Sequence, residues 1–157
     1  MIVAIDPGID GAIATLDQHA KESISVYDMP SSSKDSGKGR QLAVPHLVSL
    51  IRYWASTVCV VERVGPMPKQ GVSSVFSFGR TVGAIEGVVV ALGWPIVYVN
   101  PRAWKKHHGL EGKDKDASRT RALQLYPYLA PVLSRKKDVD RAEAVLMARW
   151  YLDTRTP

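Results

Sequence analysis

Two short apolar runs in this chain each end in a carboxylate, and they constrain the fold more than any other feature. Residues 2–5 (IVAI) stop at Asp6, and residues 58–61 (VCVV) stop at Glu62. A continuous apolar run of this length, bounded by turn residues, is typical of a strand that is covered on both faces. We therefore expect two buried strands whose ends carry acidic groups.

The remaining pattern predicts a mixed sheet flanked by helices. Further strands are expected at 12–16, 23–27 and 95–99, and helices at 45–55, 73–92, 101–107, 117–126 and 138–153. Residues 30–40 (PSSSKDSGKGR) have no apolar periodicity and are expected to form a surface loop. Strands first, then helices alternating with strands, indicate an α/β fold with a mixed sheet of about five strands. The chain length suggests one domain over residues 1–157.

Composition is compatible with a nucleic-acid partner, although many small proteins are basic simply for solubility. A formal charge of +6 and a pI near 9.5 suit a polyanion, because basic surfaces gain affinity by releasing counterions. No apolar stretch is expected to approach the length that a bilayer needs, so no membrane partner is expected. The single cysteine, Cys59, lies in an apolar run and predicts a buried thiol in a reducing compartment. The first residues lack the pattern of a signal peptide, so we expect a cytoplasmic protein.

The expected helix over 73–92 carries glycine at every fourth position, at Gly79, Gly83 and Gly87. Each glycine costs a helix about 1 kcal/mol relative to alanine. The smooth stripe that they form should therefore be compensated by close packing against the sheet or against another subunit.

The start of the last helix supplies more acids. Asp140 and Glu143 are three residues apart and share one helix face, near the N-terminus, where the backbone dipole favours negative charge. Asp138 follows the basic triplet 135–137 and presents an alternative: it either caps the helix or replaces Asp140 as a ligand. The spacing to Glu143 favours Asp140. An acid in a first helical turn is also a common cap.

Together these acids indicate a site for hard divalent cations. Oxygen ligands without paired His or Cys favour Mg²⁺, or Mn²⁺, over zinc. Two ions per active site can activate a water and stabilise the leaving oxygen of a phosphodiester. We expect Asp6 to bridge two ions, Glu62 to bind one, and Asp140 with Glu143 to bind the other or to position the water. Singly, an Asp before Pro-Gly is more often a turn residue, so the argument rests on the joint pattern.

Basic and polar residues are expected to hold the backbone of DNA without reading its sequence. Lys115, with Lys113 as the alternate, is expected near the ions, where it would offset charge on the scissile phosphate. The proposed DNA contacts are Lys69, Gln70, Ser73, Ser74, Arg80, Lys105, Lys106, Lys113, Arg119, Lys136 and Lys137. For any one of these lysines a solvated surface role has similar weight. Trp104 and Trp150 are expected in the core.

The ordered set of motifs resembles the RuvC family of Holliday-junction resolvases, within the ribonuclease H-like superfamily. The matching segments are IDPGIDGA (5–12), VVERV (60–64), FGRTVGAIEGVV (78–89), VNPRAWKK (99–106), KDASR (115–119) and DRAEAVLMA (140–148). Three segments are similar in sequence to the phage and plastid branch of that family: GVSSVFSFGR, AWKKHHGL and KKDVDRAEA.

The resemblance implies a ribonuclease H-like sheet with the first strand central and the strand ending at Glu62 beside it. It also implies a homodimer that nicks opposed strands of a four-way junction symmetrically and leaves 5′-phosphate and 3′-hydroxyl ends. A family lysine before the penultimate helix matches Lys115, and the helix at 73–92 contributes to dimerisation. Branched DNA is thus the expected substrate, with no small-molecule substrate. Two departures are Glu143 in place of the Asp of bacterial members, and Val139 where relatives often have His.

Three rivals follow from the same residues. A phosphate-binding ATPase of the actin or sugar-kinase type also begins with an Asp-x-Gly turn, but it needs two such domains. A non-catalytic DNA-binding module would have lost at least one of the four acids, and none is lost. A superfamily nuclease acting on flaps, other branched DNA or RNA–DNA hybrids is the serious rival, because it shares the metal site.

Overall fold

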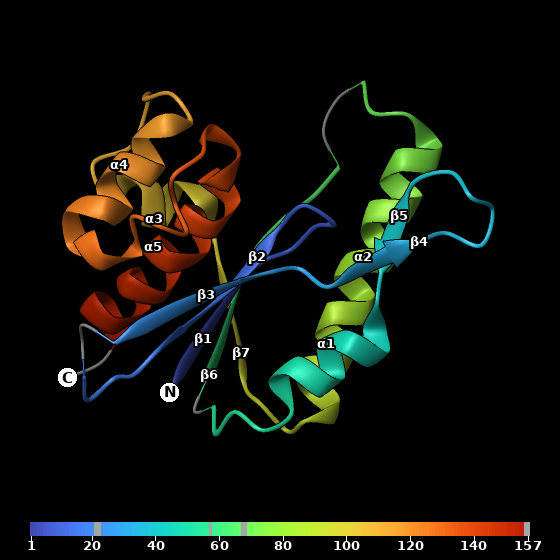
Figure 1. The fold of residues 1–157 in the computed structure, drawn as a ribbon, viewed down its shortest axis with the longest axis horizontal. Coiled ribbons are helices and arrows are strands. Elements are labelled where there is room, and N and C mark those ends of the chain that lie inside the picture. The colour runs from blue at the N-terminus through green and yellow to red at the C-terminus, as the bar shows by residue number, and fades with distance from the viewer. Residues whose placement is uncertain (21–22, 57, 67–68, 156–157) are drawn as a thin grey trace.

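The chain folds into a mixed five-stranded sheet in the order β3-β2-β1-β6-β7, with helices on both faces (Figure 1). The computed structural model describes residues 1–20, 23–56, 58–66 and 69–155. The sheet strands are β1 (Ile2–Asp6), β2 (Ala12–Leu16), β3 (Ile24–Asp28), β6 (Val58–Glu62) and β7 (Ile96–Val99). The helices are α1 (Val44–Ile51), α2 (Val72–Ala91), α3 (Pro101–His107), α4 (Asp116–Leu125) and α5 (Val139–Arg155), with 3₁₀ turns at Pro127–Leu129 and Lys136–Asp138.

The first strand lies at the centre of the sheet, as expected. β1 pairs antiparallel with β2 and parallel with β6, and β7 continues the parallel part beyond β6. The four residues of β1 from Ile2 to Ile5 are completely buried, which agrees with a strand covered on both faces. The ribonuclease H-like architecture expected from the order of elements is therefore confirmed.

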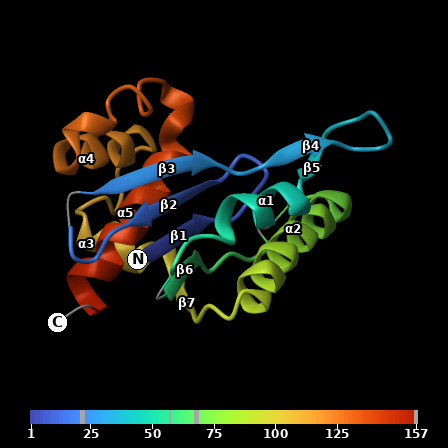
Figure 2. The same cartoon turned by 60° about the horizontal axis from the view of Figure 1, so that its bottom comes forward.

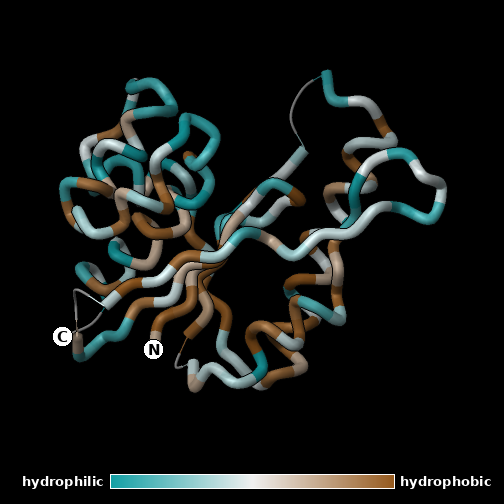
Figure 3. The backbone as a smooth tube through the Cα atoms, in the orientation of Figure 1, coloured by the Kyte–Doolittle hydropathy of each residue, from teal (hydrophilic) through white to brown (hydrophobic). Residues whose placement is uncertain are grey.

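Side chains alternate between two cores, one on each face of the sheet. Ile2 and Ala4 pack with α3, α4 and α5, whereas Val3 and Ile5 pack with α1 and α2. Figure 2 shows α5 beneath one face and the α1 and α2 pair against the other. Figure 3 shows β1 in brown at the middle of the sheet, whereas the loop at the tip of the β4–β5 hairpin is mainly teal and white.

The single cysteine lies within the core on the α2 side. Cys59 is completely buried, and desolvation raises the pKa of its thiol to about 12. At neutral pH it is therefore protonated and unreactive, because the thiolate is the nucleophilic form. The expectation of a buried core thiol is confirmed.

The segment expected as an irregular loop contains regular structure. Ser31–Ser33 (β4) and Arg40–Leu42 (β5) pair antiparallel as a two-stranded ribbon that projects from the sheet toward α2 (Figure 1). Its tip closes with glycines at positive φ, Gly37 and Gly39. The prediction was wrong because serine and arginine at a hairpin give no apolar alternation, and backbone pairing alone defines these short strands.

Helix boundaries moved by only a few residues, and one expectation about α2 fails. By length and composition alone, α2 is long and apolar enough to cross a membrane, although no such stretch was expected. Arg80 and Glu86 interrupt its middle, and its buried residues face the sheet. α2 therefore covers one face of the sheet with its few buried residues, and the rest of the helix is exposed or half-buried.

Candidate active site

The turn after β1 fixes the position of Asp6. A Cβ at Gly11 would overlap the backbone carbonyl of Asp6, so only glycine permits β2 to begin this close to the end of β1. The register pairs Asp6 with Ala12 across the two strands. The tight glycine turn thus holds the Asp6 side chain at the strand end and prevents the backbone from shifting.

Strand alternation directs both strand-end acids to the same face. Asp6 follows Ala4 by two residues and Glu62 follows Val60 by two, and Ala4 and Val60 both belong to the core on the α5 side. β1 and β6 are parallel neighbours whose pairing ends at Ile5 and Val61, immediately before the acids. The two carboxylates therefore lie side by side, facing α5, as the sequence predicted.

The first turns of α5 bring two further acids to this edge. Glu143 accepts a hydrogen bond from the buried Ser118 hydroxyl of α4, at 3.2 Å from its Oε1. Lys105 of α3 places its Nζ 3.7 Å from the same oxygen. Asp140 is half-buried, and burial raises the pKa of its carboxyl group, while the nearby positive charge of Lys115 opposes this rise. Asp140 and Glu143, three residues apart, thus lie on one face of α5. Their basic neighbours are Lys105 from α3 and Lys115, which directly precedes α4.

Electrostatic coupling shows that the four acids form one cluster. Burial, then the negative charges of Glu62, Asp140 and Glu143, raise the pKa of Asp6 to about 8. Burial and the charge of Glu143 also raise the pKa values of Glu62 and Asp140. Like charges held together in a partly desolvated place disfavour ionisation, and a bound cation reverses this penalty. The donor set therefore suits a hard divalent ion.

The acidic side chains of the cluster are not arranged as ligands around one common point. Within the described parts of the chain, no three His, Cys, Asp or Glu side chains lie close enough together to hold one metal ion. The negative charges of the other three acids contribute to raising the pKa of Asp6, and two of the acids are hydrogen-bonded elsewhere: Glu62 to Trp104 and Glu143 to Ser118.

Trp104 is a site residue that the sequence reasoning assigned only to the core. It is completely buried, as expected, and its indole Nε1–H donates a 2.9 Å hydrogen bond to Glu62 Oε1. The ammonium group of Lys105 lies 5.0 Å from the centre of the Trp104 ring. The adjacent lysine in AWKK was the only hint, because helical spacing reveals burial but not the partner of an indole N–H.

Asp138 and Asp140 occupy different surroundings. Asp138 is buried, and its carboxylate accepts hydrogen bonds from the Arg135 backbone N–H at 2.8 Å and from the Arg135 guanidinium at 2.6 Å. These bonds hold the pKa of Asp138 below its usual range. Arg141 lies 3.8 Å from the same carboxylate and also pairs with Asp28 at the end of β3. Asp138 thus forms the capping box of the 3₁₀ turn Lys136–Asp138 together with Arg135, directly before α5.

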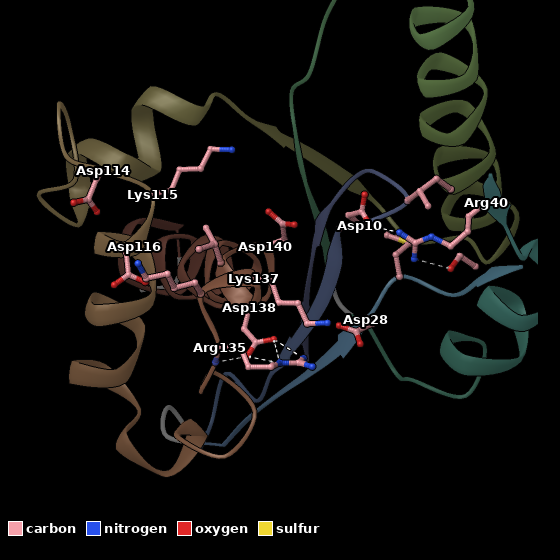
Figure 4. A pocket seen from close by; sticks show the side chains of 16 residues that line it. Asp10, Asp28, Arg40, Asp114, Lys115, Asp116, Arg135, Lys137, Asp138 and Asp140 are labelled. Atoms are coloured by element: carbon pink, nitrogen blue, oxygen red, sulfur yellow. Dashed lines mark hydrogen bonds and ion pairs between the residues drawn. The ribbon is translucent and has the colours of Figure 1, made fainter. Parts of the chain in front are cut away.

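An open groove of about 930 Å³ runs past Asp140 (Figure 4). The lysines Lys115, Lys136 and Lys137 line it together with Arg135, and Arg40 of the ribbon borders it on the opposite side. Figure 4 shows Lys115 and Asp140 on one wall and the Asp10–Arg40 pair on the other. The groove is wide, polar and open, which suits a nucleic-acid backbone better than a small molecule.

The predicted DNA contacts are scattered over several places. Lys136 and Lys137 line the groove, whereas Lys105 contacts the acids and Arg119 is engaged with Asp116 at 2.8 Å and the Leu133 carbonyl at 3.1 Å. Lys106 is exposed on α3, and Lys113 is exposed beside α4. At the start of α2 the exposed residues are Lys69, Gln70, Ser73 and Ser74, and Arg80 lies further along that helix.

A second hollow of about 740 Å³ separates the ribbon from α2. Ser74 and Arg80 line it from α2, and Lys34 lines it from the ribbon. Asp10 and Arg40 form an ion pair and line both hollows, so this pair lies where they meet. Arg40 was missed because it ends the segment that was expected to be a loop.

Comparison with known proteins gives a consistent likeness. No family model matches the chain. It is 34% identical over 92 residues to the chloroplastic Holliday junction resolvase MOC1 of Chlamydomonas reinhardtii; the match covers 58% of this chain and 10% of that protein. The chain therefore spans about a tenth of the length of this relative.

Among solved structures, the fold is similar to that of Thermus thermophilus RuvC. The TM-score is 0.54 at 13% identity, covering 96% of this chain and 93% of that one. A T. thermophilus RuvC in complex with a Holliday junction substrate gives a TM-score of 0.53 at 13% identity, covering 99% and 96% of the two chains. At this identity the match shows the fold. The expected likeness to RuvC-type resolvases, including the plastid kind, is confirmed.

Proposed function

We propose that this chain is a metal-dependent endodeoxyribonuclease that resolves four-way DNA junctions, because it is RuvC-like in fold and similar in sequence to a plastid resolvase. One observation carries the proposal: acids from two adjacent strand ends and from the start of α5 converge at one edge of the sheet. These acids are Asp6, Glu62, Asp140 and Glu143. The rival of a non-catalytic binder gains no support from such a cluster, because unneutralised acids repel phosphate.

The metal is proposed as Mg²⁺, with Mn²⁺ as a substitute and two ions per site. Asp6 would help to hold both ions, Glu62 would hold one, and Asp140 with Glu143 would hold the other. The burial and negative charges that raise the pKa of Asp6 support a cation at this place, because a bound cation would stabilise the ionised carboxylates. When bound, the ions would supply a water of lowered pKa and neutralise charge on the scissile phosphate.

The chain's own groups would orient the reaction. Lys115, near Asp140, would contact the scissile phosphate and offset its growing negative charge. A water held near Asp140 and Glu143 would attack phosphorus, and the 3′ oxygen would leave with a proton. The products are a 5′-phosphate and a 3′-hydroxyl, which a ligase can rejoin.

Symmetric nicking requires two such sites, and α2 supports a homodimer. A Cβ added at Gly79, Gly83 or Gly87 would meet no atom within 4 Å in the described part of the chain, so the smooth stripe is not packed against the sheet. Phe76 and Val90 on the same helix are 66% and 64% exposed. An uncovered apolar surface of this kind is typical of a protein interface.

The test compares labelled four-way junction, flap, plain duplex and RNA–DNA hybrid with Mg²⁺ or with EDTA. We expect paired nicks in the junction, dependence on Mg²⁺, and loss of cutting in Asp6→Asn. Asp17→Asn is the matched control, because Asp17 lies in the turn after β2, away from the acidic cluster, and accepts a hydrogen bond from the His19 backbone. Equal cutting of flaps or hybrids would favour the broader superfamily nuclease, and cutting in EDTA would reject the metal.

A second comparison separates the neighbouring aspartates of α5. Asp140→Asn should abolish cutting with little change in melting temperature, because Asp140 borders the open groove. Asp138→Asn should lower the melting temperature, because it breaks the bonds to Arg135. Reversed outcomes, with an active Asp140→Asn and an inactive but stable Asp138→Asn, would move the ligand role to Asp138.

A further inference from the structure

The short helix α3 begins where its first turn can reach the acidic cluster. Val99 of β7 is paired with Glu62 of β6, and the next residue, Asn100, caps α3 by accepting a 2.9 Å hydrogen bond from the Arg102 backbone N–H. Pro101 at the first helical position fixes the turn. The side chain of Trp104 therefore lies at the end of β6, beside the carboxylate of Glu62.

The indole of Trp104 has one polar atom, the ring nitrogen, and its N–H is donated to Glu62, the proposed metal ligand. Trp104 is completely buried, and an indole N–H is a donor only, so leaving it without an acceptor would be costly. Its acceptor is Glu62 Oε1 at 2.9 Å. A phenylalanine would fill most of the same volume in the core, so packing alone does not require a tryptophan here.

The hydrogen bond gives the two carboxylate oxygens of Glu62 different roles. Oε1 accepts the indole N–H, and in this orientation Oε2 would be the oxygen that binds a cation. Outer groups that orient a ligand in this way raise metal affinity, and their removal typically costs about 10-fold to 100-fold. The ring face of Trp104 also holds the Lys105 ammonium at 5.0 Å, and that ammonium lies 3.7 Å from Glu143 Oε1. The indole of Trp104 thus contacts Glu62 directly and is linked to Glu143 through the ammonium group of Lys105.

We propose that Trp104 is a positioning residue that orients the Glu62 carboxylate for metal binding through its indole N–H. The inference rests on the proposed function, since it assumes that Glu62 is a metal ligand. It goes beyond that function by giving a core tryptophan a defined part in it.

The first test is Trp104→Phe, which keeps an aromatic ring and removes the N–H. Trp150→Phe is the matched control, because Trp150 is a nearly buried tryptophan of the same core cluster. Isothermal titration of each full-length protein with Mn²⁺ should show about 10-fold to 100-fold weaker binding for Trp104→Phe and unchanged binding for Trp150→Phe. Unchanged Mn²⁺ affinity in a folded Trp104→Phe protein would overturn the inference, as would equal losses in both variants.

The second test needs no change at Trp104. The chain has four tryptophans, so a ¹⁵N-labelled sample gives four indole N–H signals, which Phe substitutions at Trp54, Trp94 and Trp150 assign by elimination. Titration with Mg²⁺ should shift the Trp104 signal and leave the other three in place. A Trp104 signal that stays fixed while Mg²⁺ binds refutes the positioning role and leaves the nuclease proposal intact. A wild-type chain that binds neither Mg²⁺ nor Mn²⁺ and cuts no junction rejects both.

Discussion

The two faces of the sheet differ in how completely their main helix is covered. α5 buries most of its length, from Ala142 to Leu152, against β1, β2 and β3. α2 is longer, yet only Thr81, Ile85, Val88 and Val89 are buried along its 20 residues. The acidic cluster lies on the α5 side. The acids of the proposed site thus lie beside a helix that is largely buried within one chain, whereas α2, on the other face, keeps exposed apolar side chains such as Phe76 and Val90.

The largest expected effect is at Asp6, on the α5 side. Burial and its acidic neighbours raise the pKa of Asp6 to about 8, so between about pH 4 and pH 8 the folded chain binds a proton that the unfolded chain releases. In EDTA the wild type should therefore lose stability as pH rises through this window. Asp6→Asn should flatten the loss while its junction cutting falls by more than about 100-fold.

Thermal unfolding in EDTA from pH 5 to pH 9 measures this slope. Asp17→Asn again serves as the control and should keep the wild-type slope and activity, since Asp17 lies in the turn after β2, away from the acidic cluster. If Asp6→Asn and the wild type showed the same pH dependence, the acids would not be coupled as described.

Core packing should separate the two helices next. Leu146 of α5 is completely buried, so Leu146→Ala should lower the free energy of unfolding by about 2–5 kcal/mol. Val90 of α2 is 64% exposed, so Val90→Ala should change it by less than about 0.5 kcal/mol. Urea denaturation of dilute protein measures both. Similar losses for the two variants would mean that α2 is covered in the isolated chain.

A histidine adds a pH test on the α5 side. His108 is buried, its Nε2–H donates to the Leu146 carbonyl at 2.8 Å, and burial lowers its pKa to about 4. The folded chain thus keeps His108 neutral, and its contribution is present above about pH 6.5 and is lost as pH falls toward 4. The loss is at most on the order of 3 kcal/mol. His108→Gln should remove this part of the acid sensitivity, whereas the exposed His46→Gln should not.

The smallest effect on the fold is expected at the open face of α2. Phe76→Glu places a charge on a side chain that is 66% exposed, so the melting temperature of dilute protein should hardly change. Light scattering over a range of concentrations should instead show weaker association than in the wild type. A wild type that stays monomeric at every concentration would contradict the homodimer and make the open face unexplained.

The sequence was informative where one strong pattern decides the structure. Unbroken apolar runs before Asp6 and Glu62 identified the two central strands, and the spacing of Asp140 and Glu143 identified one face of the last helix. Ribbon strands β4 and β5 were missed, since three-residue strands of polar side chains carry no periodic signal. Hydrogen-bond partners could not be predicted either: nothing in the sequence assigns Trp104 to Glu62 or Ser118 to Glu143, because such bonds depend on how separate elements meet.

The sequestered thiol of Cys59 has a practical consequence. It is the chain's single cysteine, and at neutral pH it is protonated and shielded from reagents. A second cysteine introduced at the ribbon tip, for example in place of Ser36, would then be alkylated selectively in the folded protein. Fluorophores or spin labels could be attached there without first removing the native sulfur, which opens the ribbon and the adjoining grooves to distance measurements on DNA-bound samples.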